Sequence, residues 1–333
     1  MIKTLTYNQI DSQQWQTLVD QSPYATWFQT PEAYQFYASV SEMIPFVTAV
    51  ENNGKLRAIC VGYTTKETNA IKQYLTCRAI IIGGPLLVDD ATDEEVATLL
   101  KAVTNAFTPY TLHPTPIYIE SRNFHDYSKW RNIFEQCGFA YQPHYDIHVH
   151  CNAAHIMSEQ RRRQLKKAIK NGAEICEAQS EQDIRDWYLI LSQLYREKVR
   201  TPLFSVDFFL QFYSNKVCKY LLVKYEGKII GGMMCPILEG KAIYEWYVCG
   251  ADEEYKELYP SVVATHAAIE YAKTNGLPLF DFMGAGNPDE AYGVRDFKME
   301  FGGELVEHGR YLCVRKPMLY WIGKMGVKWL KRK

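Results

Sequence analysis

A chain of 333 residues exceeds the size of one ordinary hydrophobic core, so two domains of average size are expected. Hydrophobic residues make up 47% of the chain and charged residues 23%, a globular composition that excludes a mainly disordered protein. The formal net charge of −1 excludes a polycation that binds nucleic acid with its whole surface. Any binding of RNA or of an anionic surface must therefore come from local patches.

The nine cysteines are scattered, and no two have the spacing of a CxxC pair. An odd number fits no closed disulfide framework, so reduced and mostly buried thiols in a cytoplasmic protein are expected. The first residues contain no apolar core of signal-peptide length, and no later stretch reaches membrane-spanning length. Neither secretion nor a membrane span is expected.

The first half of the chain is expected to mix helices and strands. Asp11 is placed to cap a short helix, and Pro31 falls near the first turn of a second one. Asn53 and Gly54 predict the turn of a β-hairpin, and Gly138 predicts the end of a short helix. In chain order the patterns predict a hairpin over 46–65, a strand over 79–88, a helix over 89–107, a strand over 116–122, a helix over 130–139 and a strand over 144–151.

The second half partly repeats this order after a basic helix over 158–172. The patterns predict helices over 182–199 and 206–215, a strand meander over 220–250, a helix over 260–276, and strands over 277–284 and 309–316. Such a succession indicates a duplicated α/β unit with mixed sheets. The expected domains are residues 1–155 and 175–316, with a basic linker helix over 156–174 between them and a tail over 317–333.

Residues 281–305 are the most informative stretch for function. Gly284 opens a loop after a strand, and a short helix is expected beyond it. Arg295 and Lys298 are three positions apart on one face of that helix. Two cations after a glycine loop would suit phosphate or the negative charge that develops in a transition state. An exposed basic helix face explains the same spacing.

This stretch resembles the C-terminal signature of the Fem-like peptidoglycan-branching aminoacyltransferases. That family has a strand ending in Asp-Phe with glycine, a loop, and then Tyr-Gly, a Phe-Lys pair and Phe-Gly-Gly. The matching residues here are Asp281, Phe282, Gly284, Tyr292, Gly293, Phe297, Lys298, Phe301 and Gly302. Weaker matches are the GGPLL run at 83–87, the basic helix and the aromatic run at 244–250.

The resemblance implies two tandem acetyltransferase-like (GNAT-like) acyltransferase domains with an inter-domain cleft. It also implies transfer of an aminoacyl group from aminoacyl-tRNA to an amine of a peptidoglycan precursor. By this analogy Lys298 lies at the transfer site, Phe297 shapes the pocket beside it, and Tyr247 lines the same cleft. An arginine of the family corresponds to Arg196 or Arg200.

Further residues take roles in the same reaction. The attacking amine must be neutral, and Asp281 is a candidate base for its deprotonation. Lys298, helped by Arg295, would stabilise the oxyanion or the phosphates of the leaving group. Gly284 and Tyr292, in the matching signature, are assigned to substrate binding.

The chain departs from the family near its N-terminus, where a lysine normally follows an aromatic residue and binds the phosphates of the precursor. Gln29, also assigned to substrate binding, and Tyr34 are present in this region, but no lysine is within reach. The long charged helical hairpin of some members is also missing. Two alternatives therefore stay open: an N-acyltransferase of the same fold with another amine and acyl donor, and a non-catalytic module that binds cell-wall precursors.

Coenzyme A is not expected as the donor. Ordinary acetyltransferases hold its pyrophosphate with a glycine-rich loop at a helix N-terminus. The corresponding runs here, residues 86–95 and 249–261, are acidic and lack that glycine spacing. Aminoacyl-tRNA or another activated acyl donor is expected as a co-substrate, and no permanently bound cofactor.

Two further patterns each have a functional and a purely structural interpretation. The basic helix places four cations on one face, a candidate patch for tRNA or for an anionic head group, or else a solvated helix face: Arg163, Lys166, Lys167 and Lys170. Alternation places His144, Asp146, His148 and His150 on one side of a strand. Because ligands two residues apart on one strand rarely complete a tetrahedral zinc site, a polar sheet face is expected and no metal.

The tail over 317–333 carries large apolar residues among lysines and arginines. At helical spacing they predict a basic amphipathic helix that lies on a membrane or docks on the protein itself: Trp321, Ile322, Met325, Trp329 and Leu330. A lipid-linked precursor would give membrane contact a purpose. The expected location is cytoplasmic, with peripheral contact at the inner face of the membrane.

Overall fold

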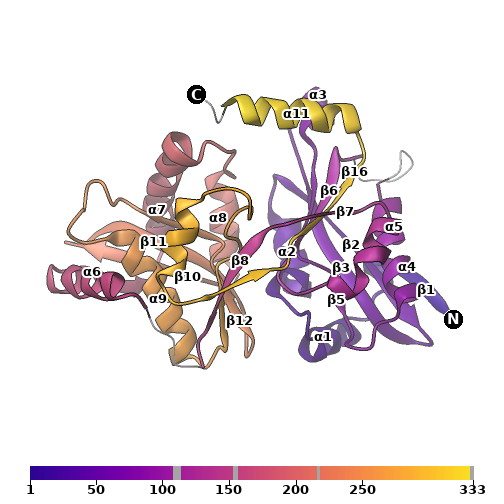
Figure 1. The fold of residues 1–333 in the computed structure, drawn as a ribbon, viewed down its shortest axis with the longest axis horizontal. Helices are drawn as coiled ribbons and strands as arrows, with labels where there is room; N and C mark the ends of the chain where they lie inside the picture. Colours follow the sequence, from indigo (N-terminus) through magenta and orange to yellow (C-terminus); the bar gives the residue numbers. More distant parts are fainter. Residues whose placement is uncertain (108–113, 153–156, 216–217, 331–333) are drawn as a thin grey trace. The chain divides into compact units, whose positions relative to one another are not determined.

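The computed structural model describes residues 1–107, 114–152, 157–215 and 218–330, without the side chains of 327–330. It divides the chain into two units (Figure 1). Unit 1 consists of Met1–Pro143 and His308–Lys333, and unit 2 of His144–Glu307. No helix in the described part of the chain is long and apolar enough to cross a membrane.

Unit 1 is built on a mixed eight-stranded sheet. Its strands lie in the order β1 (Ile2–Thr6), β2 (Met43–Asn52), β3 (Lys55–Thr65), β4 (Ala79–Gly83), β6 (Tyr118–Asn123), β16 (Arg310–Val314) and β7 (Ala140–Gln142), and β5 (Leu86–Leu87) also pairs with β3. The helices are α1 (Ser12–Gln21), α2 (Pro31–Ser39), α3 (Ala70–Thr76), α4 (Asp93–Asn105), α5 (Arg131–Gln136) and α11 (Pro317–Leu330). The pair β4–β6 is parallel, and the other pairs are antiparallel.

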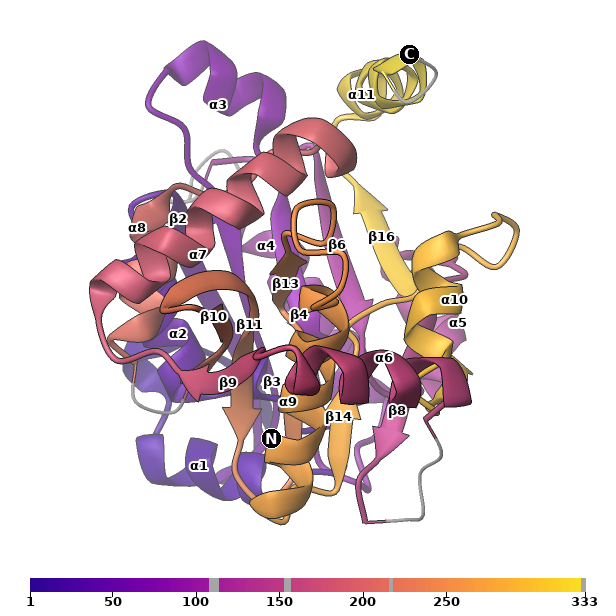
Figure 2. The same cartoon turned by 90° about the vertical axis from the view of Figure 1, so that its left-hand side faces the viewer.

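Unit 2 has a second sheet of the same size. Its strands lie in the order β9 (Glu174–Glu177), β10 (Cys218–Tyr225), β11 (Lys228–Leu238), β12 (Ala242–Tyr244), β14 (Leu279–Asp281), β8 (Tyr145–His150) and β15 (Glu304–Glu307), and β13 (Tyr247–Gly250) also pairs with β11. The helices are α6 (Glu159–Lys170), α7 (Glu181–Leu194), α8 (Val206–Tyr213), α9 (Pro260–Thr274) and α10 (Gly293–Met299). Figure 2 shows α6 and α9 close together, in agreement with their contacts.

The two sheets have the same topology. In each, one strand pairs with two successors at different points along its length: β3 with β4 and β5, and β11 with β12 and β13. In each, the first of these successors pairs in parallel with the next strand, β6 or β14. The duplicated α/β unit with mixed sheets predicted from the sequence is therefore confirmed.

Each half of the chain contributes its last strand to the sheet of the other half. The sequence assigns residues 144–151 to the first half and 309–316 to the second. Instead, β8 lies between β14 and β15 in unit 2, and β16 lies between β6 and β7 in unit 1. Both strands take the same position in their sheets: β8 pairs antiparallel with β14, and β16 pairs antiparallel with β6. Both bury apolar side chains in the sheet that they join.

The limits of the units differ accordingly from the sequence-based ones. The chain passes between units at Pro143 and at Glu307, whereas the predicted domains end at 155, which lies outside the described residues, and at 316. The predicted linker helix is α6, which belongs to unit 2 and packs on α9 through Ala168. It is therefore part of the second domain and not a separate connector.

Local signals explain most element boundaries. The Asp11 carboxylate accepts from the N–H of Gln14 and begins α1, and Thr30 caps α2 directly before Pro31. The hairpin between β2 and β3 turns at Asn53 and Gly54, both with positive φ. Helix α3 is an element that the sequence patterns did not predict.

The exchange of strands makes unit 1 depend on the end of the chain. Tyr311 of β16 is buried and stacks on Phe134 with ring centroids 3.9 Å apart. We expect a fragment of residues 144–307 to unfold cooperatively, and a fragment of residues 1–143 to show no cooperative transition, because the latter lacks a strand between β6 and β7. Urea titrations followed by circular dichroism test this. Cooperative unfolding of the isolated 1–143 fragment would contradict the exchange.

Candidate functional site in unit 2

The candidate site lies where the chain passes from β12 to β13. The N–H of Glu245 donates to the carbonyl of Asp281 on β14 at 2.9 Å, and the next N–H, of Trp246, donates to Met234 on β11 at 3.1 Å. Beyond this step β13 pairs with β11 and not with β14. The side chain of Glu245 is thus placed at the divergence of two strands, and it is buried.

Lys298 forms an ion pair with Glu245. Its Nζ lies 2.8 Å from Oε1 of Glu245 and donates to the carbonyls of Phe282 and Gly284, both at 2.9 Å. These three partners match the three N–H groups of an ammonium. Lys298 is only 8% exposed, so the expectation of an exposed basic helix face is wrong at this residue. The physical reason is that Glu245 supplies a buried countercharge, without which burial of the ammonium would be too costly.

Burial also affects Glu245. Removal from water raises the pKa of this carboxyl, and the nearby Lys298 ammonium offsets only part of the rise. A carboxylate with a raised pKa is better suited to take up a proton near neutral pH than an ordinary surface carboxylate. The pair therefore combines a candidate base with a fixed positive charge.

Arg295, the second predicted cation, is also engaged with backbone carbonyls. Its guanidinium donates to the carbonyls of Ala285, Asn287 and Glu290 and lies 4.9 Å from the ring centroid of Tyr145. Together with Lys298 it holds the loop between β14 and α10. The two cations thus bind the chain's own carbonyls in this structure, where the sequence suggested a clamp for ligand charge.

The glycines of this loop are required by its backbone. Gly284 has φ +132° and Gly286 has φ +83°, values that favour glycine. The N–H of Gly284, a predicted substrate-binding position, donates to the Asp146 carboxylate at 2.7 Å. Met283 between them and β14 also has a positive φ of 55°, so the loop is held in a strained conformation by its side-chain contacts.

A second polar group adjoins the ion pair at the end of β14. Asp281 is fully buried, accepts from the N–H of Met283 at 2.6 Å, and lies 3.4 Å from Nε2 of His148. Burial alone would raise the pKa of Asp281, but His148 outweighs this and lowers it. Burial likewise opposes the charged form of His148, yet Asp281 raises its pKa to about 9. For Asp146, burial and then repulsion by Asp281 raise the pKa well above the usual range.

These side chains are the group that could be considered for a metal. One atom each of Asp146, His148 and Asp281 lies within 4.8 Å of the others. However, one oxygen of Asp146 already accepts from two backbone N–H groups, and Asp281 is paired with His148. The polar sheet face expected along this strand is buried at Asp146 and His148, while the exposed His150 faces Glu304 at 3.2 Å. The arrangement is a compensated charge network.

Aromatic side chains connect two other predicted residues. Tyr195, at the start of a π-helical turn over Tyr195–Val199, has its ring centroid 6.1 Å from that of Tyr247. Burial, and then the proximity of Tyr292, raises the pKa of Tyr195 to about 12. Tyr292 is half-exposed and lies against Gly286. Tyr247 itself packs among the phenylalanines of α8.

The remaining predicted residues of unit 2 lie on its surface. Arg196 and Arg200 are exposed at the π-helical turn, and Arg200 has a positive φ of 54°. Phe297 is half-buried beneath the guanidinium of Arg161, which lies 4.3 Å from its ring centroid and pairs with Glu300 at 2.6 Å. Phe297 therefore contacts α6 through Arg161.

The basic patch of α6 is exposed and partly paired. Arg163 lies 3.1 Å from Glu159, and Lys167 pairs with Glu257. Lys166 and Lys170 are exposed on the same helix. Exposed pairs of this kind contribute little stability, so their cations stay accessible to a polyanion.

Gln29 has a structural position in unit 1. It has no exposed surface, and its amide donates to the carbonyls of Val61 and Ile82 and accepts from the N–H of Val61. The side chain therefore bridges β3 and β4 beyond their last ladder pair. This enclosure differs from the sequence-based assignment of Gln29 to substrate binding, because its side chain replaces missing strand hydrogen bonds.

The helix that follows the divergent strands begins at acidic groups in both units. In unit 1, Thr92 and Glu95 form a capping box at α4, next to Asp93 and Glu94. In unit 2, the Asp252 carboxylate accepts from the N–H and the hydroxyl of Ser261 in the first turn of α9. Carboxylates thus occupy the helix N-termini whose N–H groups and dipole would otherwise attract a pyrophosphate.

Sequence reasoning missed Glu245, and it identified Asp146 and His148 only as part of a polar sheet face, not as members of the site. A lone carboxylate inside the apolar run 242–250 was the available signal for Glu245, since an unpaired charge is rarely placed in a buried strand.

The ion pair gives a stability prediction. Lys298→Met leaves the Glu245 carboxylate buried without its countercharge and should lower the free energy of unfolding by about 3–5 kcal/mol. Adding Glu245→Leu should restore most of this loss. Urea unfolding measures both, with Lys273→Met as a control because its pair with Glu270 is partly exposed. A loss below about 0.5 kcal/mol for Lys298→Met would mean that Lys298 is a surface lysine.

Known proteins are similar in fold to this chain. Residues 159–299 match a family model described as an acetyltransferase (GNAT) domain. No curated protein sequence matches the chain. Among solved structures, the crystal structure of FemX has a TM-score of 0.71 at 13% identity, covering 96% of this chain and 99% of that one.

Two further structures have lower scores. The C-terminal domain of a putative lysylphosphatidylglycerol synthetase from Agrobacterium fabrum has a TM-score of 0.59 at 11% identity, covering 95% of each chain. A tandem GNAT protein from the clavulanic acid biosynthesis pathway has a TM-score of 0.55 at 10% identity, covering 94% of this chain and 98% of that one. The chain therefore shares its fold with FemX and with the tandem GNAT protein, the fold that its C-terminal signature predicts, and residues 159–299 match the acetyltransferase (GNAT) family model.

Proposed function

We propose that this protein transfers an activated acyl or aminoacyl group to a primary amine, and that the transfer takes place at the Glu245–Lys298 pair of unit 2. The observation that carries the proposal is the burial of this pair at the divergence of β12 and β13, inside the segment that matches the acetyltransferase family model. Buried ionisable groups with shifted pKa values are typical of catalytic sites.

The corresponding positions in unit 1, all within the described residues, hold no buried ion pair. Aligned through the strand ladders, Glu245 corresponds to Ile82, Asp281 to Ser121 and His148 to Tyr311. There the ring of Tyr127 lies against Gly84, and its hydroxyl donates to the carbonyl of Pro85 at 2.7 Å. Unit 1 also has charges on the adjacent strands, where Glu120 pairs with Arg122 and Arg310, but none of these residues occupies the three aligned positions, and this favours unit 2 as the catalytic unit.

The chemistry requires a neutral amine. The amine attacks the carbonyl carbon of the activated group, its proton passes to the Glu245 carboxylate, and the ester bond to the donor breaks as that proton moves to the leaving oxygen. Lys298 contributes its fixed positive charge near the developing oxyanion. Asp281, the base suggested by the sequence, is enclosed and paired with His148, so its role in this scheme is to hold the end of β14 in place.

Aminoacyl-tRNA is the proposed donor, and an amine of a peptidoglycan precursor is the proposed acceptor. The fold shared with FemX and with a putative lysylphosphatidylglycerol synthetase supports aminoacyl transfer. The carboxylates at the starts of α4 and α9 speak against coenzyme A. The cations of α6 and the exposed Arg196 and Arg200 are available for the tRNA backbone.

An N-acyltransferase of the same fold that acts on another amine with a different acyl donor is the second candidate. It is favoured by the enclosure of Gln29 and by the missing lysine near it, since these leave the N-terminal region without the family's phosphate contact. The nine free cysteines fit a reducing cytoplasmic compartment in either case.

Kinetics of the ion-pair variants test the proposal. With any donor and amine that the wild-type protein uses, Lys298→Met/Glu245→Leu should transfer about a hundred- to a thousandfold more slowly, because a fixed charge at the oxyanion is gone. Its restored stability separates this loss from unfolding. The Lys273→Met control should retain wild-type turnover. A double variant with wild-type turnover would remove the pair from the mechanism.

A further inference from the structure

Helix α11 exposes an apolar stripe on unit 1. Met318, Trp321, Ile322 and Met325 follow the i, i+3, i+4, i+7 spacing of one helix face and are between 53% and 75% exposed. The opposite face of α11 contacts the sheet of unit 1, since the ring centroid of Tyr320 lies 5.6 Å from that of Tyr118 on β6. Such a stripe normally packs on a core, so the helix holds an apolar face outward.

Helix α3 exposes a second apolar face beside it. Ile71, Tyr74 and Leu75, at i, i+3 and i+4, are 72%, 60% and 46% exposed. Lys316, directly before α11, donates to the carbonyl of Tyr74 at 3.2 Å and lies 3.8 Å from its ring centroid. Figures 1 and 2 both draw α3 and α11 at the same end of unit 1. The exposed apolar residues of the two helices are here together called the α3–α11 face.

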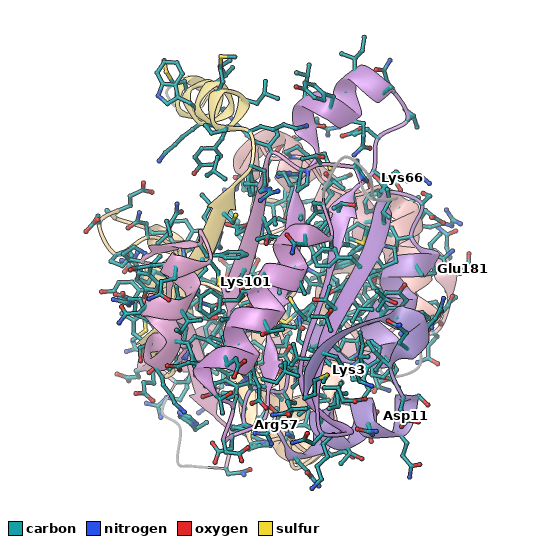
Figure 3. The ribbon with its side chains drawn as sticks, turned by 90° about the vertical axis from the view of Figure 1, so that its right-hand side faces the viewer. Lys3, Asp11, Arg57, Lys66, Lys101 and Glu181 are labelled. Atoms are coloured by element: carbon teal, nitrogen blue, oxygen red, sulfur yellow. The ribbon has the colours of Figure 1, made fainter. Side chains whose placement is uncertain are left out.

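The sequence that leads into and forms α11 is rich in basic residues. Residues 308–333 contain eight lysines and arginines and no Asp or Glu. Lys66 lies near α3, at the end of unit 1 opposite to Lys3 and Arg57 (Figure 3). The acidic residue in the α3 segment over 64–78 is Glu67, which is paired with Lys72 at 2.7 Å.

We infer that the α3–α11 face docks on an anionic phospholipid surface. Apolar and aromatic side chains with lysines around them are the composition of helices that lie in the membrane interface. A second copy of this chain fits less well, because two such faces would bring like charges together. The inference extends the membrane helix predicted for the tail to α3. It goes beyond the transfer reaction, and its test measures binding, so its failure would leave the proposed function untouched.

Vesicle binding of the full chain tests the inference. We expect the protein to sediment with vesicles of phosphatidylcholine and phosphatidylglycerol and to bind vesicles of phosphatidylcholine alone about tenfold or more weakly. Binding should weaken in 0.5 M salt. Trp321→Ser/Met325→Ser and Ile71→Ser/Leu75→Ser should each reduce the partition coefficient about tenfold, since each removes exposed apolar area.

Leu189→Ser is the matched control, because Leu189 is 66% exposed on α7 of unit 2, away from the α3–α11 face in sequence and unit. It should bind vesicles like the wild type, and all variants should keep the wild-type unfolding midpoint. Equal vesicle binding by the wild type and both double variants would overturn the inference. A lipid-free dimer that the same variants dissociate, seen by light scattering, would assign the face to a second copy instead.

Discussion

The buried ion pair between Glu245 and Lys298 is the interaction on which the site of this protein depends. A charge inside a domain is tolerated only with a countercharge and satisfied hydrogen bonds, and Lys298 has both. The same ammonium binds carbonyls at the start of the loop after β14, and Arg295 binds the next carbonyl of that loop, of Ala285. One pair thus links a strand end, a glycine loop and a short helix.

The duplicated topology allows the position of this ion pair to be compared with the equivalent position in unit 1. In both sheets, two successive strands pair with different parts of one neighbouring strand. Both sheets also contain a strand from the other half of the chain. In unit 1 the divergence is closed by Gln29 and Tyr127, whose polar atoms are bound to the backbone. In unit 2 it carries ionisable side chains. In a duplicated fold, one copy can thus have a structural role while the other carries the catalytic groups.

The sequence predicts what depends on near neighbours. The cap at Asp11, the helix start near Pro31, the turn at Asn53-Gly54 and the order of the longer elements could be read directly, and the C-terminal signature led to the correct fold. The partners of the strands could not be predicted, because β8 and β16 each pair with strands that lie more than a hundred residues away in the sequence. The burial of Lys298 was missed for the same reason: its partner Glu245 precedes it by 53 positions (298 − 245). Helix α3 was missed because it is short and its apolar residues are largely exposed.

The most direct test of the central claim is the mass of the acceptor after reaction. Purified protein would be incubated with a pool of charged tRNA and a peptidoglycan-precursor peptide that has a free amine, and the peptide would be analysed by mass spectrometry. The account predicts a peptide heavier by one amino-acid residue, and no acetylated peptide when acetyl-coenzyme A replaces the tRNA. Acetylation by acetyl-coenzyme A, with no gain of mass from any charged tRNA, would contradict it.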